Sequence, residues 1–417
     1  MLQTFASSIS SLLDARALGH SLPAGLYTRE DVFEADLDVF FRRHWICIGL
    51  ECDVPEAGDA TVIDIGKTSL ILLRDDDGQI RVVHNVCRHR GSRLLDAGKT
   101  IVSKLVCPYH TWTYELTGEL SHAPHMGKGF DKECRSLKPV TLKSIGGLIY
   151  ICLSEHPPED IGHLEHVMAE RLAPYDVRNA KVAYETDVIE HGNWKLTIEN
   201  NRECYHCSAN HPELCVSFVD LDFGFDPETL SPDDRAQAEE HFELYAKRTE
   251  QWENDGYPSA AVEQLVFCST NFRTQRLIIS GAGESQTPDA TAASAKLLGS
   301  ITRKDLGDTH LWGHNSWKHF MGDHAVVSTI IPLSADTTLV RTKWLVHKDA
   351  VEGVDYDLEK LTSVWVATTD QDAELVARNH AGVEDPAYIP GPYSPFTETN
   401  LDKFATWYID RMRAHGY

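Results

Sequence analysis

The sequence lacks the features that mark several common classes of protein. No apolar stretch approaches the ~20 residues that a membrane-spanning helix needs. The first twenty residues carry no basic segment followed by an apolar core, so we do not expect a secretory signal, and a transit peptide is a minor alternative. Basic residues are scarce: 39 Lys and Arg face 63 Asp and Glu, and the net charge of −24 disfavours nucleic acid or an anionic membrane as partner. We therefore expect a cytoplasmic protein.

Cysteine and histidine are plentiful instead, with 10 and 21 residues in a chain of 417. A chain of this length suits two or three domains and can bury a sizeable core. In a reducing compartment, cysteines are better explained as metal ligands and buried thiols than as disulfides.

The pattern of apolar residues predicts an α+β protein in three parts. Residues 1–44 form an N-terminal segment with a short helix that packs on the last domain, and residues 45–155 read as an all-β domain of short strands and turns. Residues 156–417 predict an α+β domain with helices and a central antiparallel sheet. Its expected sheet strands are His310–Phe320, Ala325–Ile331 and Thr338–Val346, and its expected late helices are Asp357–Arg378 and Thr397–His415. Residues Asp226–Gly256 predict a solvated acidic helix, and Gly281–Ala295 a mobile loop.

A first cluster of possible metal ligands lies in the β-rich part. Cys87 and His89 are one residue apart, and Cys107 and His110 follow with two residues between them. Two thiolates and two imidazoles on two loops are the ligand set of a Rieske [2Fe–2S] centre. A structural Cys2His2 zinc site is the alternative, although the spacing differs from that of zinc fingers.

A second cluster follows in the α+β part. Glu203, His206 and His211 are spaced as acid-x2-His-x4-His. Two histidines and a carboxylate on one side of Fe(II) leave coordination positions open for dioxygen. On a regular helix, five residues would leave the two imidazoles roughly 140° apart, so the helix must break or bulge between them. Nearby cysteines allow a rival zinc site, but packed thiols are the preferred interpretation of Cys204, Cys207 and Cys215.

Both motifs resemble those of the Rieske non-haem iron oxygenases. CRHRG and CPYHTWTY match the Rieske signature, and ECYHC with HPEL resembles the branch that oxidises quaternary ammonium compounds. The resemblance implies Asp372, after Gln371 in a late helix, as the third iron ligand, in preference to Asp370 or Glu374. It also implies that Glu203 bridges His206 and a Rieske histidine of a neighbouring subunit, His110, within a homotrimer. Most members of the family carry Asp at that position.

The resemblance implies a terminal monooxygenase component that hydroxylates an N-methyl group. Glycine betaine is the expected substrate, giving dimethylglycine and formaldehyde, with proline betaine, carnitine, choline or an aromatic ring as alternatives. Electrons from NAD(P)H would come through a separate flavin and iron–sulfur reductase, because the chain has no nucleotide-binding glycine motif. An electron carrier without chemistry of its own and a zinc-stabilised binding protein are the rival classes.

The residues offer candidates for binding such a substrate. A trimethylammonium group is best held by aromatic faces, and four aromatic residues on expected strands are candidates, although each is equally well explained as core: Trp312, Trp317, Phe320 and Trp344. A carboxylate would need a donor, and the sequence does not select among His310, His314, His319, His324 and Lys318.

Overall fold

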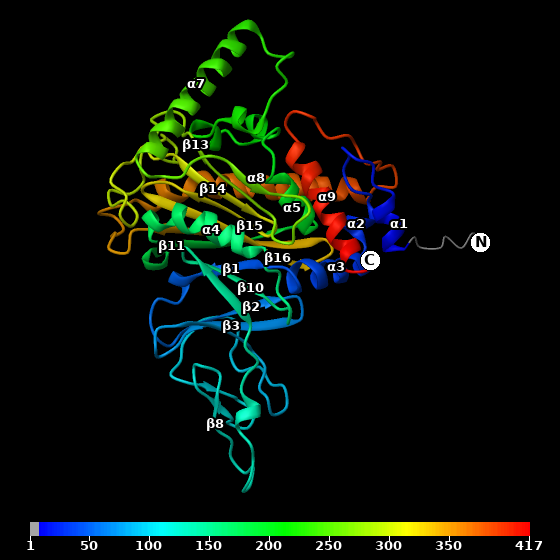
Figure 1. Cartoon of the computed structure of the whole chain (residues 1–417), viewed down its shortest axis with the longest axis vertical. Coiled ribbons are helices and arrows are strands. Elements are labelled where there is room, and N and C mark those ends of the chain that lie inside the picture. Colours follow the sequence, from blue (N-terminus) through cyan, green and yellow to red (C-terminus); the bar gives the residue numbers. More distant parts are fainter. Residues whose placement is uncertain (1–7) are drawn as a thin grey trace, which may run out of the picture.

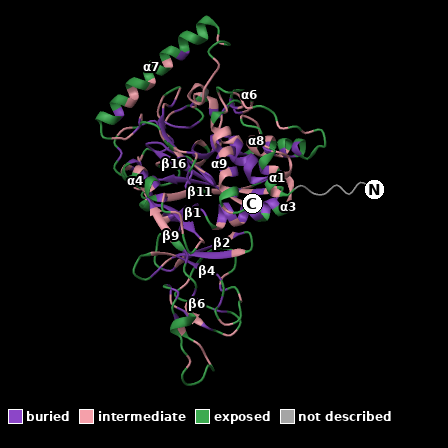
Figure 2. Ribbon diagram, turned by 45° about the vertical axis from the view of Figure 1, so that its right-hand side comes forward, coloured by how far each residue is buried: buried purple, intermediate pink, exposed green. Residues whose placement is uncertain are grey.

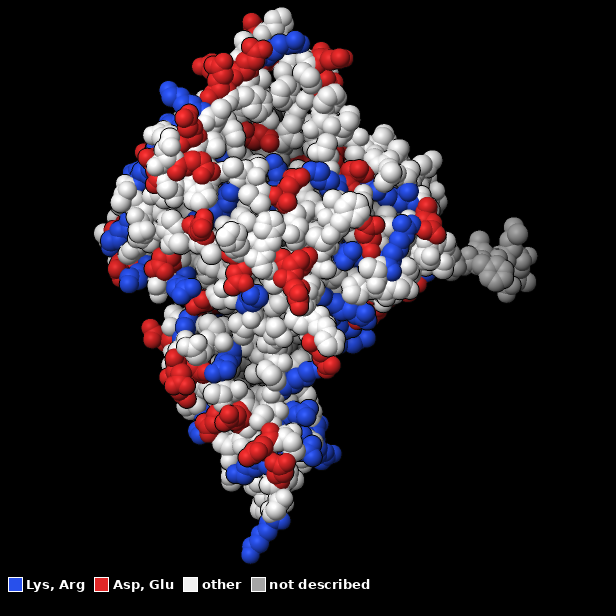
Figure 3. All heavy atoms as spheres, viewed as in Figure 1, with Lys and Arg blue, Asp and Glu red and all other residues white. Residues whose placement is uncertain are grey.

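The computed structural model describes residues 8–417, so the first seven residues of the expected N-terminal segment lie outside it. Figure 1 shows a β-rich part at one end of the long axis and a larger part, built on one broad sheet, at the other. Within the described residues, no helix is both long enough and apolar enough to cross a membrane. Acidic side chains are spread over the face seen in Figure 3, including the projecting helix α7.

The β-rich part holds three small antiparallel sheets, ordered β1-β10-β9, β4-β3-β2-β5 and β6-β7-β8. Strand β3 is buried through its middle, as expected for a short apolar run between turns. Gly66 turns the chain between β2 and β3 with a φ of 53°, which glycine adopts without steric cost. The strands are β1 Ile46–Leu50, β2 Asp59–Ile65, β3 Thr68–Arg74, β4 Ile80–His84, β5 Gly98–Ile101, β6 Leu105–Val106, β7 Thr113–Tyr114, β8 Leu120–His122, β9 Thr141–Ile145 and β10 Leu148–Cys152.

The larger part is organised around a seven-stranded antiparallel sheet in the order β11-β17-β16-β15-β14-β13-β12. Its inner strands are almost fully buried, and Figure 2 shows them in the middle of the molecule. Together with the helices, this sheet confirms the predicted α+β class. The strands are β11 Lys181–Glu190, β12 Val262–Gln264, β13 Phe272–Leu277, β14 Asp308–Gly313, β15 Ser316–Phe320, β16 His324–Ser334 and β17 Thr337–Val346.

One long helix of the larger part packs on the sheet and another projects from it. Helix α8 (Leu358–Glu384) begins at Asp357, whose side chain accepts from the Lys360 N–H, and it packs against β11 and the short helix α5 (Trp194–Asn200). Helix α7 (Pro232–Asn254) is largely exposed and extends away from the body (Figure 1). The other helices are α1 Ile9–Asp14, α2 Gly25–Thr28, α3 Glu30–Asp36, α4 Ile161–Leu172, α6 Cys207–Asn210, α9 Thr399–Ala414 and the short helical segments η1 Leu37–Arg42, η2 Glu51–Asp53, η3 Glu133–Arg135, η4 Ala173–Tyr175, η5 Val177–Asn179, η6 Leu214–Val216 and η7 Asp220–Phe223.

The structure differs from the sequence predictions in two places near the site. The expected strand His310–Phe320 is a hairpin, because His314 and Asn315 form a two-residue turn between β14 and β15. The expected mobile loop Gly281–Ala295 has no regular structure, but its middle is buried and hydrogen-bonded. Ser285, for example, is fully buried and donates to Asp323.

Candidate metal centre

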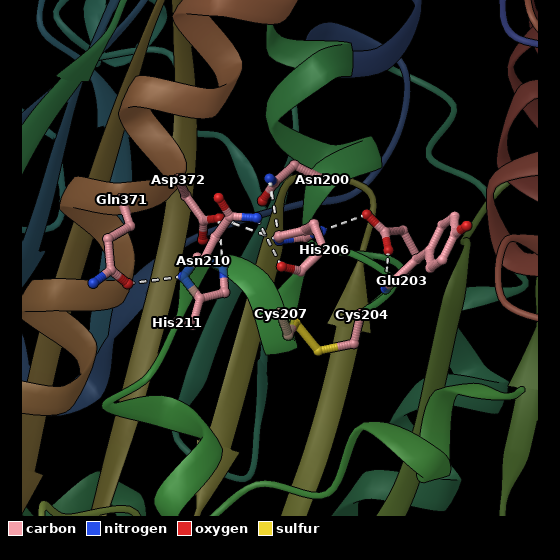
Figure 4. Close-up of a disulfide and its surroundings, with 10 residues drawn as sticks. Asn200, Glu203, Cys204, His206, Cys207, Asn210, His211, Gln371 and Asp372 are labelled. Carbon is pink, nitrogen blue, oxygen red and sulfur yellow. Dashed lines mark hydrogen bonds and ion pairs between the residues drawn. A yellow bond between two sulfur atoms is a disulfide. The ribbon is translucent and has the colours of Figure 1, made fainter. Parts of the chain in front are cut away.

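His206, His211 and Asp372 come together between α6 and α8, as Figure 4 shows. The Nε2 atom of His211 lies 3.1 Å from Asp372 Oδ1, and the Nε2 atom of His206 lies 3.5 Å from the same oxygen. The two imidazole rings are 5.0 Å apart between centroids. Two nitrogens and one carboxylate oxygen thus converge on one point, which is the donor set of a facial iron triad.

The local backbone makes this convergence possible. Helix α5 ends at Asn200, and the two histidines flank the four-residue helix α6, with His206 before it and His211 after it. The backbone of His211 is not helical, with φ −121° and ψ 66°. The chain therefore departs from a regular helix around both histidines, and the two imidazoles can face the same carboxylate.

Each histidine is oriented from behind by an acceptor. His206 Nδ1 lies 2.5 Å from Glu203 Oε1, and because a carboxylate only accepts, Nδ1 must carry the proton. His211 Nδ1 lies 2.8 Å from the Gln371 amide oxygen. Gln371 in turn donates from Nε2 to Glu213. These contacts direct the Nε2 lone pairs toward Asp372, as outer partners of metal-binding histidines do.

The electrostatics of the three residues also favour a cation. Burial lowers the pKa of His206, but its hydrogen bonds with Asp372 and Glu203 outweigh burial and raise the pKa to about 9. Burial raises the pKa of Asp372, and its bonds with both histidines reverse this and lower it. A metal ion would take the place of the proton that this negative surrounding attracts.

A disulfide joins Cys204 and Cys207 beside this centre (Figure 4). The interpretation of these two cysteines as packed thiols is therefore wrong. Their Cα atoms are 5.0 Å apart, within the usual range for a bridge, because the turn through Tyr205 and His206 folds the chain back. Cys207 sulfur lies within 4.8 Å of nitrogens of both histidines. Since it is bonded to Cys204, it is not a thiolate, and the rival zinc site loses its ligands.

A cavity of about 390 Å³, counting its open mouth, begins at the three residues and runs toward β14 and β15. Its lining combines the metal-centre residues with aromatic rings and two further histidines: Phe218, Phe223, Trp365, His310 and His319. Phe218 and Phe223 are 5.1 Å apart between centroids. No Lys or Arg is found among the described lining residues.

The four aromatic residues expected to hold the substrate do not line this cavity. Trp312 and Trp317 are paired across β14 and β15, on the face of His310 and His319 but closer to the hairpin turn, and they are part of the core. Phe320 packs on Tyr175, and Trp344 on Tyr184. The sequence indicated aromatic residues on strands, whereas the rings in the cavity come from η7, the segment before it and α8.

Two of the cavity-lining residues that were not predicted from the sequence can be recognised from their spacing along α8. Trp365 and Thr368 precede Asp372 by seven and four residues, so all three share one face of α8 and line the same cavity. Phe218 and Phe223 stand in an irregular segment with no periodicity, and nothing in the sequence singles them out.

The first predicted cluster is gathered at the far end of the β-rich part. Cys87 and Cys107 are buried and lie on two loops, before β5 and between β6 and β7. The rings of His89 and His110 are 4.6 Å apart between centroids. The Nδ1 atom of His89 is buried and has no hydrogen-bond partner, as expected of a donor atom reserved for a metal. These four residues therefore fit an iron–sulfur cluster.

Comparison with known families agrees with this architecture. Residues 44–144 match the Rieske [2Fe-2S] domain, and residues 177–414 match the catalytic domain of the ring hydroxylating alpha subunit. The fold and both clusters define an O2-dependent Rieske oxygenase, with a [2Fe–2S] cluster and a mononuclear iron. The chain belongs to this family of oxygenase alpha subunits, and the resemblance drawn from its motifs is confirmed.

Within this family, the chain is similar over nearly its whole length to oxygenase subunits of two bacteria and to one solved structure. The chain is 44% identical over 409 residues to the glycine betaine monooxygenase oxygenase subunit of Pseudomonas aeruginosa strain UCBPP-PA14, covering 97% of this chain and 91% of the relative. It is 42% identical to the subunit of that name from Chromohalobacter salexigens, over 97% and 88%. A solved quaternary ammonium Rieske monooxygenase in complex with L-carnitine shares the fold, with a TM-score of 0.69 at 19% identity, over 98% of this chain and 99% of that one.

Proposed function

We propose that this protein is the oxygenase component of a monooxygenase that removes a methyl group from glycine betaine. Hydroxylation of an N-methyl group by one oxygen atom of O2, with two electrons and two protons, gives a carbinolamine and water. The hydroxymethyl group then loses its hydroxyl proton and its C–N bond breaks, which leaves dimethylglycine, formaldehyde and a proton. The observation that carries the proposal is the near-full-length similarity to glycine betaine monooxygenase oxygenase subunits. The carnitine monooxygenase relative from Escherichia coli K12 matches only 46% of this chain, at 32% identity.

The cluster would be held by Cys87, His89, Cys107 and His110. Two buried sulfurs and the unpartnered Nδ1 atom of His89 support this assignment. When bound, a Rieske cluster accepts and passes on single electrons. Because this chain has no nucleotide-binding glycine motif, a separate NAD(P)H-dependent reductase must supply them.

The iron would be held by His206, His211 and Asp372. When bound, it supplies the activation of O2 that the hydroxylation needs. The protein's own part is to keep protons on both Nδ1 atoms, through Glu203 and Gln371, so that both Nε2 atoms remain ligands. The aromatic rings of the cavity can place the quaternary ammonium group against their faces.

Glu203 would also link the two centres across a subunit boundary. In Figure 1 the β-rich part that carries residues 87–110 lies below the broad sheet, whereas α5 and α8 lie in the body of the larger part above it. A path within one chain would therefore have to cross from one part of the molecule to the other. We propose a homotrimer in which Glu203 binds His206 of its own chain and His110 of the partner subunit. Tyr109, next to His110, is 57% exposed and available for such a contact. A cytoplasmic location is part of the proposal; eight of the ten cysteines are outside disulfides, and Cys204 and Cys207 form the one disulfide among the described residues.

A substrate panel tests the proposed activity. Iron-loaded protein, a compatible reductase and NADH are mixed with glycine betaine, proline betaine, carnitine, choline or salicylate, and formaldehyde and hydroxylated products are measured. We expect glycine betaine to give formaldehyde and dimethylglycine most efficiently. Turnover of salicylate alone would contradict the proposal. A higher kcat/KM for carnitine or choline than for glycine betaine would support the proposed N-methyl hydroxylation but contradict glycine betaine as the substrate.

A further inference from the structure

Two histidines that line the cavity each have a buried ring nitrogen without a hydrogen-bond partner in the protein. His310 on β14 and His319 on β15 are directly paired across the hairpin, and their rings stack 4.5 Å apart at 12°. They are 5% and 3% exposed, and the Nε2 atom of each is buried without a hydrogen-bond partner. A buried polar atom left without a partner is costly, so a pair of them facing a cavity points to a ligand.

We propose that His310 and His319 bind the carboxylate of the substrate. This inference rests on the proposed function and assigns the end of the zwitterion that lies away from the iron. The cavity lining contains no Lys or Arg among the described residues, and apart from the histidines of the metal centre these two rings are its only side chains that can carry a positive charge. Glu203 and Asp372 lie at the opposite, negative end.

The surroundings of His319 prepare it to donate toward an anion. Its Nδ1 lies 2.6 Å from Asp308 Oδ2, so Asp308 accepts the proton on that nitrogen. Gln286 donates to the same carboxylate and accepts from the Trp365 indole N–H. With Nδ1 committed to Asp308, Nε2 is the ring nitrogen left for the carboxylate, and a hydrogen bond from Nε2 requires a proton on both ring nitrogens.

His310 completes the anchor as a neutral donor. Burial lowers its pKa well below the usual value, so the ring carries a single proton, which Nε2 can direct at the carboxylate. The carboxylate would then accept one hydrogen bond from each ring. The other three sequence candidates are occupied elsewhere: His314 contacts the Phe40 carbonyl, Lys318 donates to Ser316, and His324 contacts Ser285 and Asp323.

The dimensions of the cavity suit a compact zwitterion. The His319 ring lies 4.3 Å from the ring of Trp365, which is about two turns, or about 10 Å, along α8 from Asp372. A molecule with one methylene between its ammonium and carboxylate groups can place a methyl at the iron end and its carboxylate at the histidines. Between them the ammonium meets Phe218, Phe223 and Trp365.

Asparagine and glutamine substitutions distinguish the roles of the two ring nitrogens. In His319→Asn the amide can replace Nδ1 and keep the bond to Asp308, whereas the Nε2 donor is lost. In His319→Gln the amide reaches the Nε2 position and keeps a donor toward the cavity. His310→Asn and His310→Gln form a second pair that remains informative if a variant at position 319 does not fold. His324→Asn is the matched control, because His324 forms a similar buried pair with Asp323 outside the cavity.

The test is calorimetric binding of glycine betaine and of tetramethylammonium to anaerobic holoenzyme, with formaldehyde release from the wild type measured alongside. We expect both Asn variants to bind glycine betaine roughly 10- to 100-fold more weakly. The Gln variants should recover part of the affinity, and tetramethylammonium, which has no carboxylate, should bind all variants alike. Equal losses for both ligands, or unchanged affinity for glycine betaine in the Asn variants, would overturn the anchor. A wild type that neither binds nor demethylates glycine betaine would overturn the proposed function, and the anchor with it.

Discussion

The contact between Glu203 and His206 yields the most specific prediction about the iron site. Glu203 Oε1 lies 2.5 Å from His206 Nδ1, and its other oxygen accepts from the Tyr205 N–H. Glu203→Gln preserves the shape and one acceptor but removes the charge. A hydrogen bond to a charged group contributes about 1 kcal/mol more than a neutral one. Because 1.4 kcal/mol corresponds to a tenfold change in affinity, we expect Fe(II) to bind about fivefold more weakly.

The assay is an anaerobic competition for Fe(II) between the protein and a coloured chelator, with the absorbance of the [2Fe–2S] cluster as an internal check. Turnover is then measured at saturating iron, where we expect a further loss because the proposed link to His110 of the partner subunit is weakened. Glu170→Gln on α4 is the control, since Glu170 is exposed and far from the site in sequence. Wild-type iron affinity together with wild-type turnover in Glu203→Gln would refute both roles of this residue.

Three further predictions follow from the structure. Asp372→Asn should lose the mononuclear iron while keeping the cluster absorbance and paramagnetic signal, and iron retained at the wild-type level with full turnover would refute the ligand assignment. Burial lowers the pKa of His314 to about 3, below the usual 6.5, so the unfolded chain takes up a proton first as the pH falls. His314→Gln should therefore gain stability relative to wild type by about 1.4 kcal/mol per pH unit between pH 6.5 and pH 4, measured by urea unfolding, and a constant difference would argue against a neutral buried His314. Non-reducing peptide mapping should find Cys204 and Cys207 in one fragment lighter by two hydrogens, whereas alkylation of both thiols without reductant would contradict the disulfide.

The parts of the fold that were predictable are those with local signals. Long helices such as α8 show apolar residues at helical spacing and a capping residue at Asp357, and the buried strands β16 and β17 read as apolar runs. The two metal motifs were visible because ligand spacing within a loop is a property of the chain itself. Rotation per residue predicted a break or bulge between His206 and His211, but the four residues between them are helical (α6, Cys207–Asn210), and the chain departs from the helix at His211 itself.

What could not be predicted depends on how distant segments pack. The hairpin of β14 and β15 puts Trp312 and Trp317 in the core and His310 and His319 on the cavity, although all four occupy one face of the two strands. Which of them belong to the core and which line the cavity depends on where α8 and η7 cross the sheet. The disulfide likewise depends on the fold of one turn, which brings the Cα atoms of Cys204 and Cys207 to 5.0 Å, and cysteine spacing alone does not reveal it.

A single-turnover experiment tests the central claim most directly, because it needs no reductase. The protein is loaded with iron, its cluster is reduced anaerobically, the reductant is removed, and glycine betaine and O2 are added together. The reduced cluster and Fe(II) hold the two electrons that the hydroxylation consumes. We predict formaldehyde and dimethylglycine in an amount comparable to the iron present, with the cluster oxidised at the same time. Oxidation of the cluster in the presence of glycine betaine without formaldehyde would contradict the account.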